Sequence, residues 1–255
     1  MSNFGASIGW GLAIAASLLA GAIAASTLKL PARVAAMITA FGGGVLLAAV
    51  ALELVPDADE RAGPALTAAG LIAGTLIYVG ADAWLARDQR MKEMRRSAHA
   101  AASGREMEMK SSEGDAARGE AIAVGLFVDG VPESLALGLT IAEGEIGLAL
   151  LFGILVGNVV EAYGAAQPIV ASGRSKSFAI GILALIGLAL ATATVLGGTV
   201  LADASPALIG TAEAIAAGAV LAVISISIVP YAFKEVSGLV ATATVLGFVA
   251  GYLLS

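Results

Sequence analysis

The sequence predicts an all-α membrane protein with eight transmembrane helices, and three observations support this fold class. The chain of 255 residues is 58% hydrophobic and 13% charged, with a mean hydropathy of +0.91, which is too apolar for a soluble domain of this length. Apolar runs of membrane-spanning length recur along it. Basic residues gather in alternate connections between these runs. We therefore expect a single transmembrane domain over residues 1–255.

Each predicted helix is an apolar run of roughly 20 residues or more, the length needed to cross a hydrocarbon core. The first run lacks a basic N-terminal region and is too long for a signal peptide, so we expect it to remain as a span. The eight runs cover residues 4–28, 34–55, 64–86, 120–142, 146–171, 177–200, 206–230 and 235–254. The one long polar connection, residues 87–119, is expected to be a flexible loop.

The distribution of Lys and Arg predicts the orientation of the chain. Of the 14 basic residues, all except Arg61 fall in the first, third, fifth and seventh connections. Connections rich in Lys and Arg stay in the cytoplasm. We therefore expect a protein of the cell membrane with both termini outside and loop 87–119 in the cytoplasm.

The residue inventory excludes several classes of function. The chain has no cysteine, so thiolate metal ligands and disulfides are absent, and its only histidine, His99, lies in the polar loop. A serine hydrolase would lack its general base within the membrane. Asp82 and Asp129 are weighed as an aspartyl protease pair, but they fall at different predicted depths, so an enzyme is not expected. Nothing in the sequence supports nucleic acid binding.

Two acidic motifs lie in the middle of the fourth and fifth predicted helices. Asp129 and Glu133 are four residues apart and share a helix face, as do Asn158 and Glu161, which are three apart. A charged side chain at this depth costs about 2.5–3.5 kcal/mol on insertion scales, so several together require a compensating partner. Carboxylate and amide oxygens suit hard divalent cations. We predict that these four residues bind a metal cation; the alternative is that they form hydrogen bonds between packed helices.

Further polar residues near helix ends are candidates for an entry or exit pathway, because acidic groups attract cations. A solvated position at the membrane interface is the alternative for each of them. The candidates are Glu53, Asp82, Glu120, Gln167 and Glu213.

The second and seventh predicted helices share a weak repeat. Residues 44–56 align with residues 218–230 at an offset of 174, with matches that include Gly44/Gly218 and Pro56/Pro230. The two helices would run in opposite directions, which predicts inverted repeats of helices 1–3 and 6–8 around helices 4 and 5, an arrangement typical of secondary transporters. Chance agreement among Ala- and Val-rich residues is the alternative.

Together these features resemble the ZIP (Zrt/Irt-like) family of divalent metal transporters. The resemblance covers essentially the whole chain, and its most specific element is the Pro-Glu motif in Asp129-Gly-Val-Pro-Glu133. It implies a 3+2+3 helix arrangement and transport of a divalent cation, such as Mn, Fe or Zn, into the cytoplasm. By position, Asp129 replaces the motif histidine, whereas Glu133, Asn158 and Glu161 keep a polar or acidic residue.

The sequence also departs from the pattern of that family. Gly130 stands where the motif has asparagine, and Gly157 removes a ligand at the start of the second motif. Ser225 and Ser227 occupy a region where relatives often have acids. These departures leave open a non-transporting or altered-substrate relative whose buried acids are structural. The expected partners are the cation substrate and the lipid bilayer, with a homodimer as one assembly.

Overall fold

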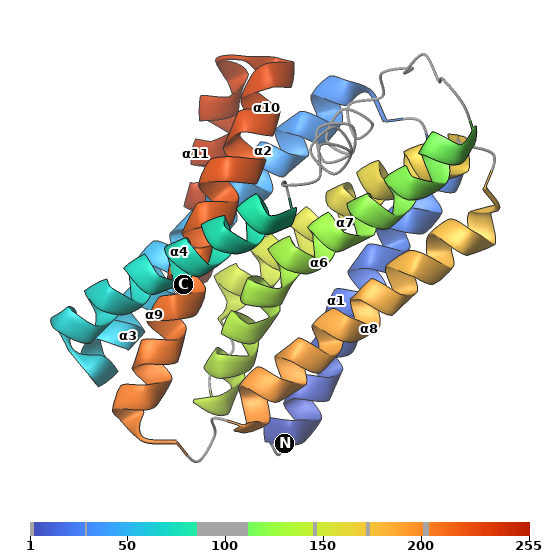
Figure 1. Ribbon diagram of the computed structural model, residues 1–255. Coiled ribbons are helices and arrows are strands. Elements are labelled where there is room, and N and C mark those ends of the chain that lie inside the picture. Colours follow the sequence, from blue (N-terminus) through green and yellow to red (C-terminus); the bar gives the residue numbers. More distant parts are fainter. Residues whose placement is uncertain (1–2, 29, 86–111, 145–146, 172–173, 201–203) are drawn as a thin grey trace.

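The computed structural model describes residues 3–28, 30–85, 112–144, 147–171, 174–200 and 204–255, and every regular element in these ranges is a helix (Figure 1). The all-α prediction is confirmed for this part of the chain. The elements are α1 (Asn3–Thr27), α2 (Ala32–Ala49), η1 (Val50–Leu54), α3 (Val55–Ala62), α4 (Pro64–Leu85), α6 (Ser112–Ala142), α7 (Leu148–Ala171), α8 (Lys176–Val200), α9 (Pro206–Val223), η2 (Ile224–Ile228), α10 (Val229–Val236) and α11 (Leu239–Leu254). Elements η1 and η2 are π-helices.

Six helical segments of the described chain are long and apolar enough to cross a membrane, which indicates a multi-pass membrane protein. They are Phe4–Thr27, Arg33–Ala62, Pro64–Trp84, Leu148–Gln167, Lys176–Val200 and Pro206–Val236. Each of the eight predicted runs lies on a helix, but two of these helices are not among the six candidate spans. Helix α6 begins in charged sequence, and α11 has only 16 residues.

Several boundaries differ from the prediction. Helix α6 begins at Ser112, so residues 112–119 of the predicted loop are helical, and residues 86–111 lie outside the described part. The second and seventh predicted helices continue past Pro56 and Pro230 as α3 and α10. Arg33–Ala62 and Pro206–Val236 are therefore single helical segments with a proline in their interior.

The same succession of elements occurs twice at the predicted offset of 174. The π-helices η1 and η2 begin at Val50 and Ile224, and each is followed by a Val-Pro pair that opens α3 or α10. Proline has no N–H, and its ring clashes with the carbonyl four residues earlier. This clash gives a physical reason for a widened turn just before each proline.

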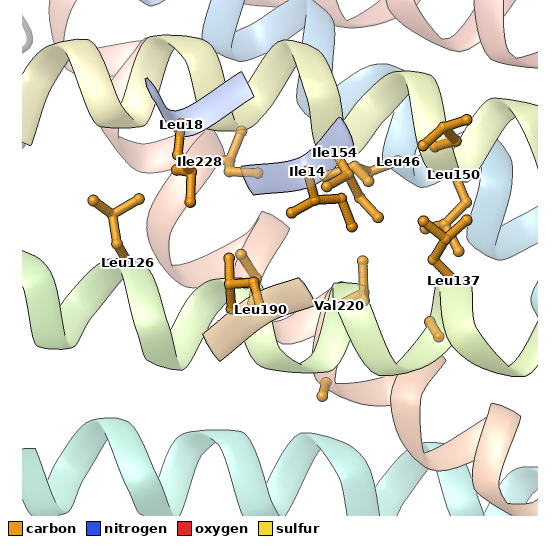
Figure 2. Packing of buried hydrophobic residues seen from close by; sticks show 14 of the residues in the cluster. Ile14, Leu18, Leu46, Leu126, Leu137, Leu150, Ile154, Leu190, Val220 and Ile228 are labelled. Carbon is orange, nitrogen blue, oxygen red and sulfur yellow. The ribbon is translucent and has the colours of Figure 1, made fainter. Parts of the chain in front are cut away.

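Helices α6 and α7 lie in the middle of the bundle, with α1 and α8 along one side and α2, α4, α9 and α11 along the other (Figure 1). Apolar side chains from α1, α2, α6, α7, α8, α9 and η2 meet in one cluster, as Figure 2 shows. The labelled residues are Ile14, Leu18, Leu46, Leu126, Leu137, Leu150, Ile154, Leu190, Val220 and Ile228. On α6, Leu126 and Leu137 flank the acidic motif along the helix, so its polar groups lie between apolar layers.

Close packing depends on glycines at matched places. A Cβ at Gly44 would meet the carbonyl oxygen of Thr244 on α11, and one at Gly218 would meet that of Leu71 on α4. Lipid tails are as apolar as leucine, so membrane helices associate mainly through such close van der Waals contact. These two contacts hold α2 to α11 and α4 to α9.

Candidate metal centre

The four predicted ligands lie on the two central helices. Asp129 and Glu133 of α6 are buried, with 7% and 6% of their surface exposed, and Asn158 of α7 is 2% exposed. Glu161 of α7 is half-buried. We refer to Asp129, Glu133, Asn158 and Glu161 as the central cluster.

The three carboxylates of the central cluster lie within electrostatic range of one another. Glu133 interacts with the charges of Glu161 and Asp129, and Glu161 with that of Asp129. Neither glutamate makes an ion pair with a described residue. Residues 119–173, which include all of α7 and most of α6, contain no Lys, Arg or His. The negative charge of Glu133 and Glu161 is therefore not balanced by any residue of the stretch 119–173.

Asp129 accepts a hydrogen bond from a tyrosine that is not among the predicted site residues. The Tyr78 hydroxyl of α4 donates a hydrogen bond of 2.6 Å to Asp129 Oδ1, and it lies 3.3 Å from Ser227 Oγ of η2. Both Tyr78 and Ser227 are buried. The only sequence signal for Tyr78 is a polar tip within an apolar run, since a buried tyrosine hydroxyl usually has a partner.

The side-chain amide of Asn158, in contrast, has an unsatisfied hydrogen-bond donor. Its Nδ2 is buried and has no hydrogen-bond partner among the described residues. A buried donor without a partner costs about 1–3 kcal/mol. A water molecule or a ligand oxygen at Nδ2 would remove this cost.

A second acidic group, formed by Asp57, Glu143 and Glu213, surrounds an arginine. It is the one group of at least three acidic or histidine side chains in the described chain whose ligand atoms all lie within 4.8 Å of one another. Arg61 Nη1 lies 2.6 Å from Glu143 Oε1 and 3.0 Å from Glu213 Oε2. We call Asp57, Arg61, Glu143 and Glu213 the Arg61 cluster.

The Arg61 cluster joins three parts of the fold. Asp57 and Arg61 belong to α3, Glu143 follows the end of α6, and the fully buried Glu213 belongs to α9. Burial and the nearby Glu213 raise the pKa of Glu143 to about 9, although the charge of Arg61 opposes this. Glu213 is a predicted pathway residue, and its partner Arg61 lies 152 positions away in sequence.

The other predicted pathway residues lie apart from these clusters. Glu53 of η1 approaches the first turn of α7, where it accepts hydrogen bonds from the amides of Ala149 and Leu150. Its second oxygen, Oε2, has no hydrogen-bond partner among the described residues. Asp82 is half-buried near the end of α4, and the side chain of Glu120 lies outside the described part.

Gln167 has a structural partner. Its Nε2 donates to the Tyr163 hydroxyl at 2.7 Å, which itself donates to the Leu28 carbonyl and accepts from the Leu30 amide. This network fastens α7 to the connection between α1 and α2. The contacts favour a packing role for Gln167 over a role in a cation pathway.

The structure gives a physical reason for one departure from the ZIP pattern, at Gly130, and places the two serines. A Cβ at Gly130 would lie 2.6 Å from Leu190 Cδ1 of α8, so a side chain larger than glycine would need Leu190 to move. Ser225 is exposed and bonds the Leu221 carbonyl, whereas Ser227 is buried beside Tyr78. His99 lies outside the described residues.

The sequence matches no protein-family model, and no curated protein is significantly similar to it.

Proposed function

We propose that the protein is a ZIP-like secondary transporter that moves a divalent metal cation across the cell membrane into the cytoplasm. The observation that carries this proposal is the central cluster, in which Asp129, Glu133 and Glu161 lie within electrostatic range at the middle of an apolar bundle. Buried charges are paired or bind metals in folded proteins. No basic residue of the stretch 119–173 can pair with them. A divalent cation would supply the missing positive charge.

The donor set favours a hard cation. Three carboxylates and the Asn158 amide offer oxygen ligands, and the chain has no cysteine. Oxygen ligands suit Mg, Ca and Mn, and carboxylates also bind Fe and Zn. Entry of a 2+ ion into a negative cell would release about 4.6 kcal/mol per 100 mV, so no ATP site is required.

The proposed architecture is a 3+2+3 arrangement in which all eight helical segments cross the membrane. Two repeats, from α1 to α4 and from α8 to α11, would surround α6 and α7. The matched boundaries at an offset of 174 and the matched glycine contacts support this arrangement. Alternating access would then come from rocking of the repeats against the central pair. Both termini would lie outside the cell, as the basic connections indicate.

A second candidate is a non-transporting or altered-substrate relative in which the buried acids are structural. The hydrogen bond from Tyr78 to Asp129 favours this candidate, because it satisfies one carboxylate oxygen without a metal.

Uptake into proteoliposomes tests the proposal. The purified protein would be reconstituted with an inside-negative potential, and entry of Mn, Fe, Co, Zn, Cd, Mg and Ca would be followed separately with trapped indicator dyes. We expect saturable uptake of at least one metal that is lost in Glu133→Gln and in Glu161→Gln. The matched control is Glu60→Gln, which changes an exposed acid outside both clusters. A folded protein that takes up none of these metals would support the structural alternative instead.

A further inference from the structure

The two ion pairs of the Arg61 cluster join different parts of the fold. Arg61 Nη1 and Glu213 Oε2, 3.0 Å apart, belong to α3 and α9, which pack directly against each other. The contact of 2.6 Å between Arg61 Nη1 and Glu143 Oε1 connects α3 to the end of α6. In the proposed rocking motion, the first pair lies within the repeats, whereas the second joins the repeats to the central helices.

Glu143 is held in place by the way in which α6 ends. Gly144 has a φ of +86°, a left-handed conformation that commonly ends a helix and favours glycine. The amides of Glu143 and Gly144 donate to the carbonyls of Leu139 and Ile141. A negative charge at the C-terminus of a helix is disfavoured by the helix dipole. The side chain of Glu143 is nevertheless only 7% exposed, and the guanidinium of Arg61 offsets this unfavourable position.

The repeat-related region around α10 lacks this arrangement. Helices α3 and α10 match in length and in their Val-Pro start, and they lie at opposite ends of the bundle (Figure 1). At the offset of 174, Arg61 corresponds to Glu235 of α10, and Glu213 corresponds to Thr39 of α2, on which α10 packs. An acid and a threonine cannot form an ion pair with each other. In transporters built from inverted repeats the two ends open in turn, so a contact built into one end only favours one of the two states.

From this asymmetry we infer that the contact between Arg61 and Glu143 is a latch, which holds the α3 end of the protein closed and must break before that end opens. The inference rests on the proposed function, in which the α3 end faces outside the cell. Arg61 keeps Glu213 as its partner when the latch breaks, so its charge is not left uncompensated. The latch can therefore open without disrupting the packing of α3 on α9.

The test uses the absence of cysteine from the chain. Asn158→Cys introduces a single thiol into the central cluster. Its rate of reaction with a membrane-impermeant thiol reagent is measured from outside in intact cells and from the cytoplasmic side in inside-out vesicles. Adding Glu143→Ala, which removes the latch, should raise the rate from outside by about 5-fold or more and lower the rate from the cytoplasmic side. Adding Glu60→Ala, which removes an exposed acid of α3, should change neither rate.

The outcomes separate this inference from the proposed function. Opposite changes on the two sides support the latch, whereas equal increases on both sides assign Glu143 a role in packing alone and overturn it. Unchanged rates also overturn the latch but leave the transporter proposal, which wild-type uptake in proteoliposomes decides separately. A thiol that reacts from neither side in any variant overturns both the latch and alternating access to the central cluster. Should Glu143→Ala fail to fold, Glu143→Asp, which withdraws the carboxylate by one methylene, decides, and unchanged rates in that variant overturn the latch.

Discussion

The central cluster and the Arg61 cluster contain similar acids but differ in their source of positive charge. Asp57, Glu143 and Glu213 surround Arg61, whose guanidinium lies within 3.0 Å of two of the carboxylates. Glu133 and Glu161 make no such pair with a described residue, and the stretch 119–173 offers no basic side chain. The Arg61 cluster includes its own cation, whereas Glu133 and Glu161 have none among the described residues.

This difference suggests different roles for the two clusters: the acids of the Arg61 cluster stabilise the fold, and those of the central cluster bind a ligand. Removing one partner of a buried ion pair leaves an uncompensated charge, so the Arg61 cluster should stabilise the fold only while it is intact. Acids without a cation repel each other, so the central cluster should destabilise the fold until a ligand or protons arrive. The two clusters should therefore respond to neutralising substitutions with opposite signs.

The largest effect is expected from removal of the built-in cation. Arg61→Met keeps an apolar stem but leaves the fully buried Glu213 without its cation, and breaking a buried pair typically costs about 3–5 kcal/mol. We expect a clear fall in thermal stability in detergent. Arg33→Met, which removes an exposed arginine, is the matched control and should change little. A melting temperature equal to wild type would mean that the Arg61 cluster does not stabilise the fold.

Neutralising the central cluster should act in the opposite direction. In the metal-free protein, the double variant Glu133→Gln, Glu161→Gln should be at least as stable as wild type, because it removes the repulsion between the two charges. The same variant should lose more than about 100-fold in metal affinity, since direct ligands contribute more than the groups that orient them. Thermal melts with and without metal measure both effects. Lower stability without metal would show that these two charges hold the fold together.

The Arg61 cluster should also make the stability of the protein depend on pH, through the titration of Glu143. The folded-state pKa of Glu143 is raised from 4.5 to about 9, so between these values the folded protein holds a proton that the unfolded chain releases. The contribution of Glu143 is therefore fully present below about pH 4.5 and is lost as pH rises through about 9. Because the two states differ by about one proton over this interval, a loss of about 2–3 kcal/mol is expected between pH 6 and 8. Urea or thermal unfolding across this range should show a flatter profile in Glu143→Gln, and parallel profiles would contradict the shift.

The smallest effect is expected at Gly157, next to Asn158 in the sequence. Gly157→Ala places a methyl group where no atom lies within 4 Å, and alanine is favoured over glycine in helices by up to about 1 kcal/mol. The variant should melt at or slightly above the wild-type temperature and keep metal uptake. Gly138→Ala on α6 is the contrasting control, because its Cβ would collide with the Thr194 carbonyl oxygen and destabilise the bundle. A large loss in Gly157→Ala would indicate that the space closes in another state of the protein.

The fold was more predictable from the sequence than the site. Each of the eight apolar runs lies on a helix, because crossing a membrane requires about 20 apolar residues in succession, as in residues 177–200. The extensions past Pro56 and Pro230 were not predicted, since proline usually ends a helical pattern. The repeat between these two regions was detected, but the π-helices within it depend on local turn geometry that residue types do not specify.

Contacts within one helix of the site can be predicted from the sequence, but contacts between helices cannot. The spacing of Asp129 and Glu133 predicts a shared helix face without any knowledge of the fold. The pairs Arg61–Glu213 and Tyr78–Asp129 join residues far apart in the chain, and only the packing of α3 on α9 and of α4 on α6 brings them together. Composition alone does not indicate which helices are neighbours.

The π-helix η2 also bears on how the chain tolerates changes in length. A π-turn holds one residue more than an α-turn, so deleting one residue within Ile224–Ile228 could be absorbed by conversion to an ordinary turn. The same deletion inside the regular part of α9 would rotate everything after it by about 100 degrees. The segment around η2 is therefore one where a shortened homologue could keep α10 in register, and the corresponding segment Val50–Leu54 would share this tolerance.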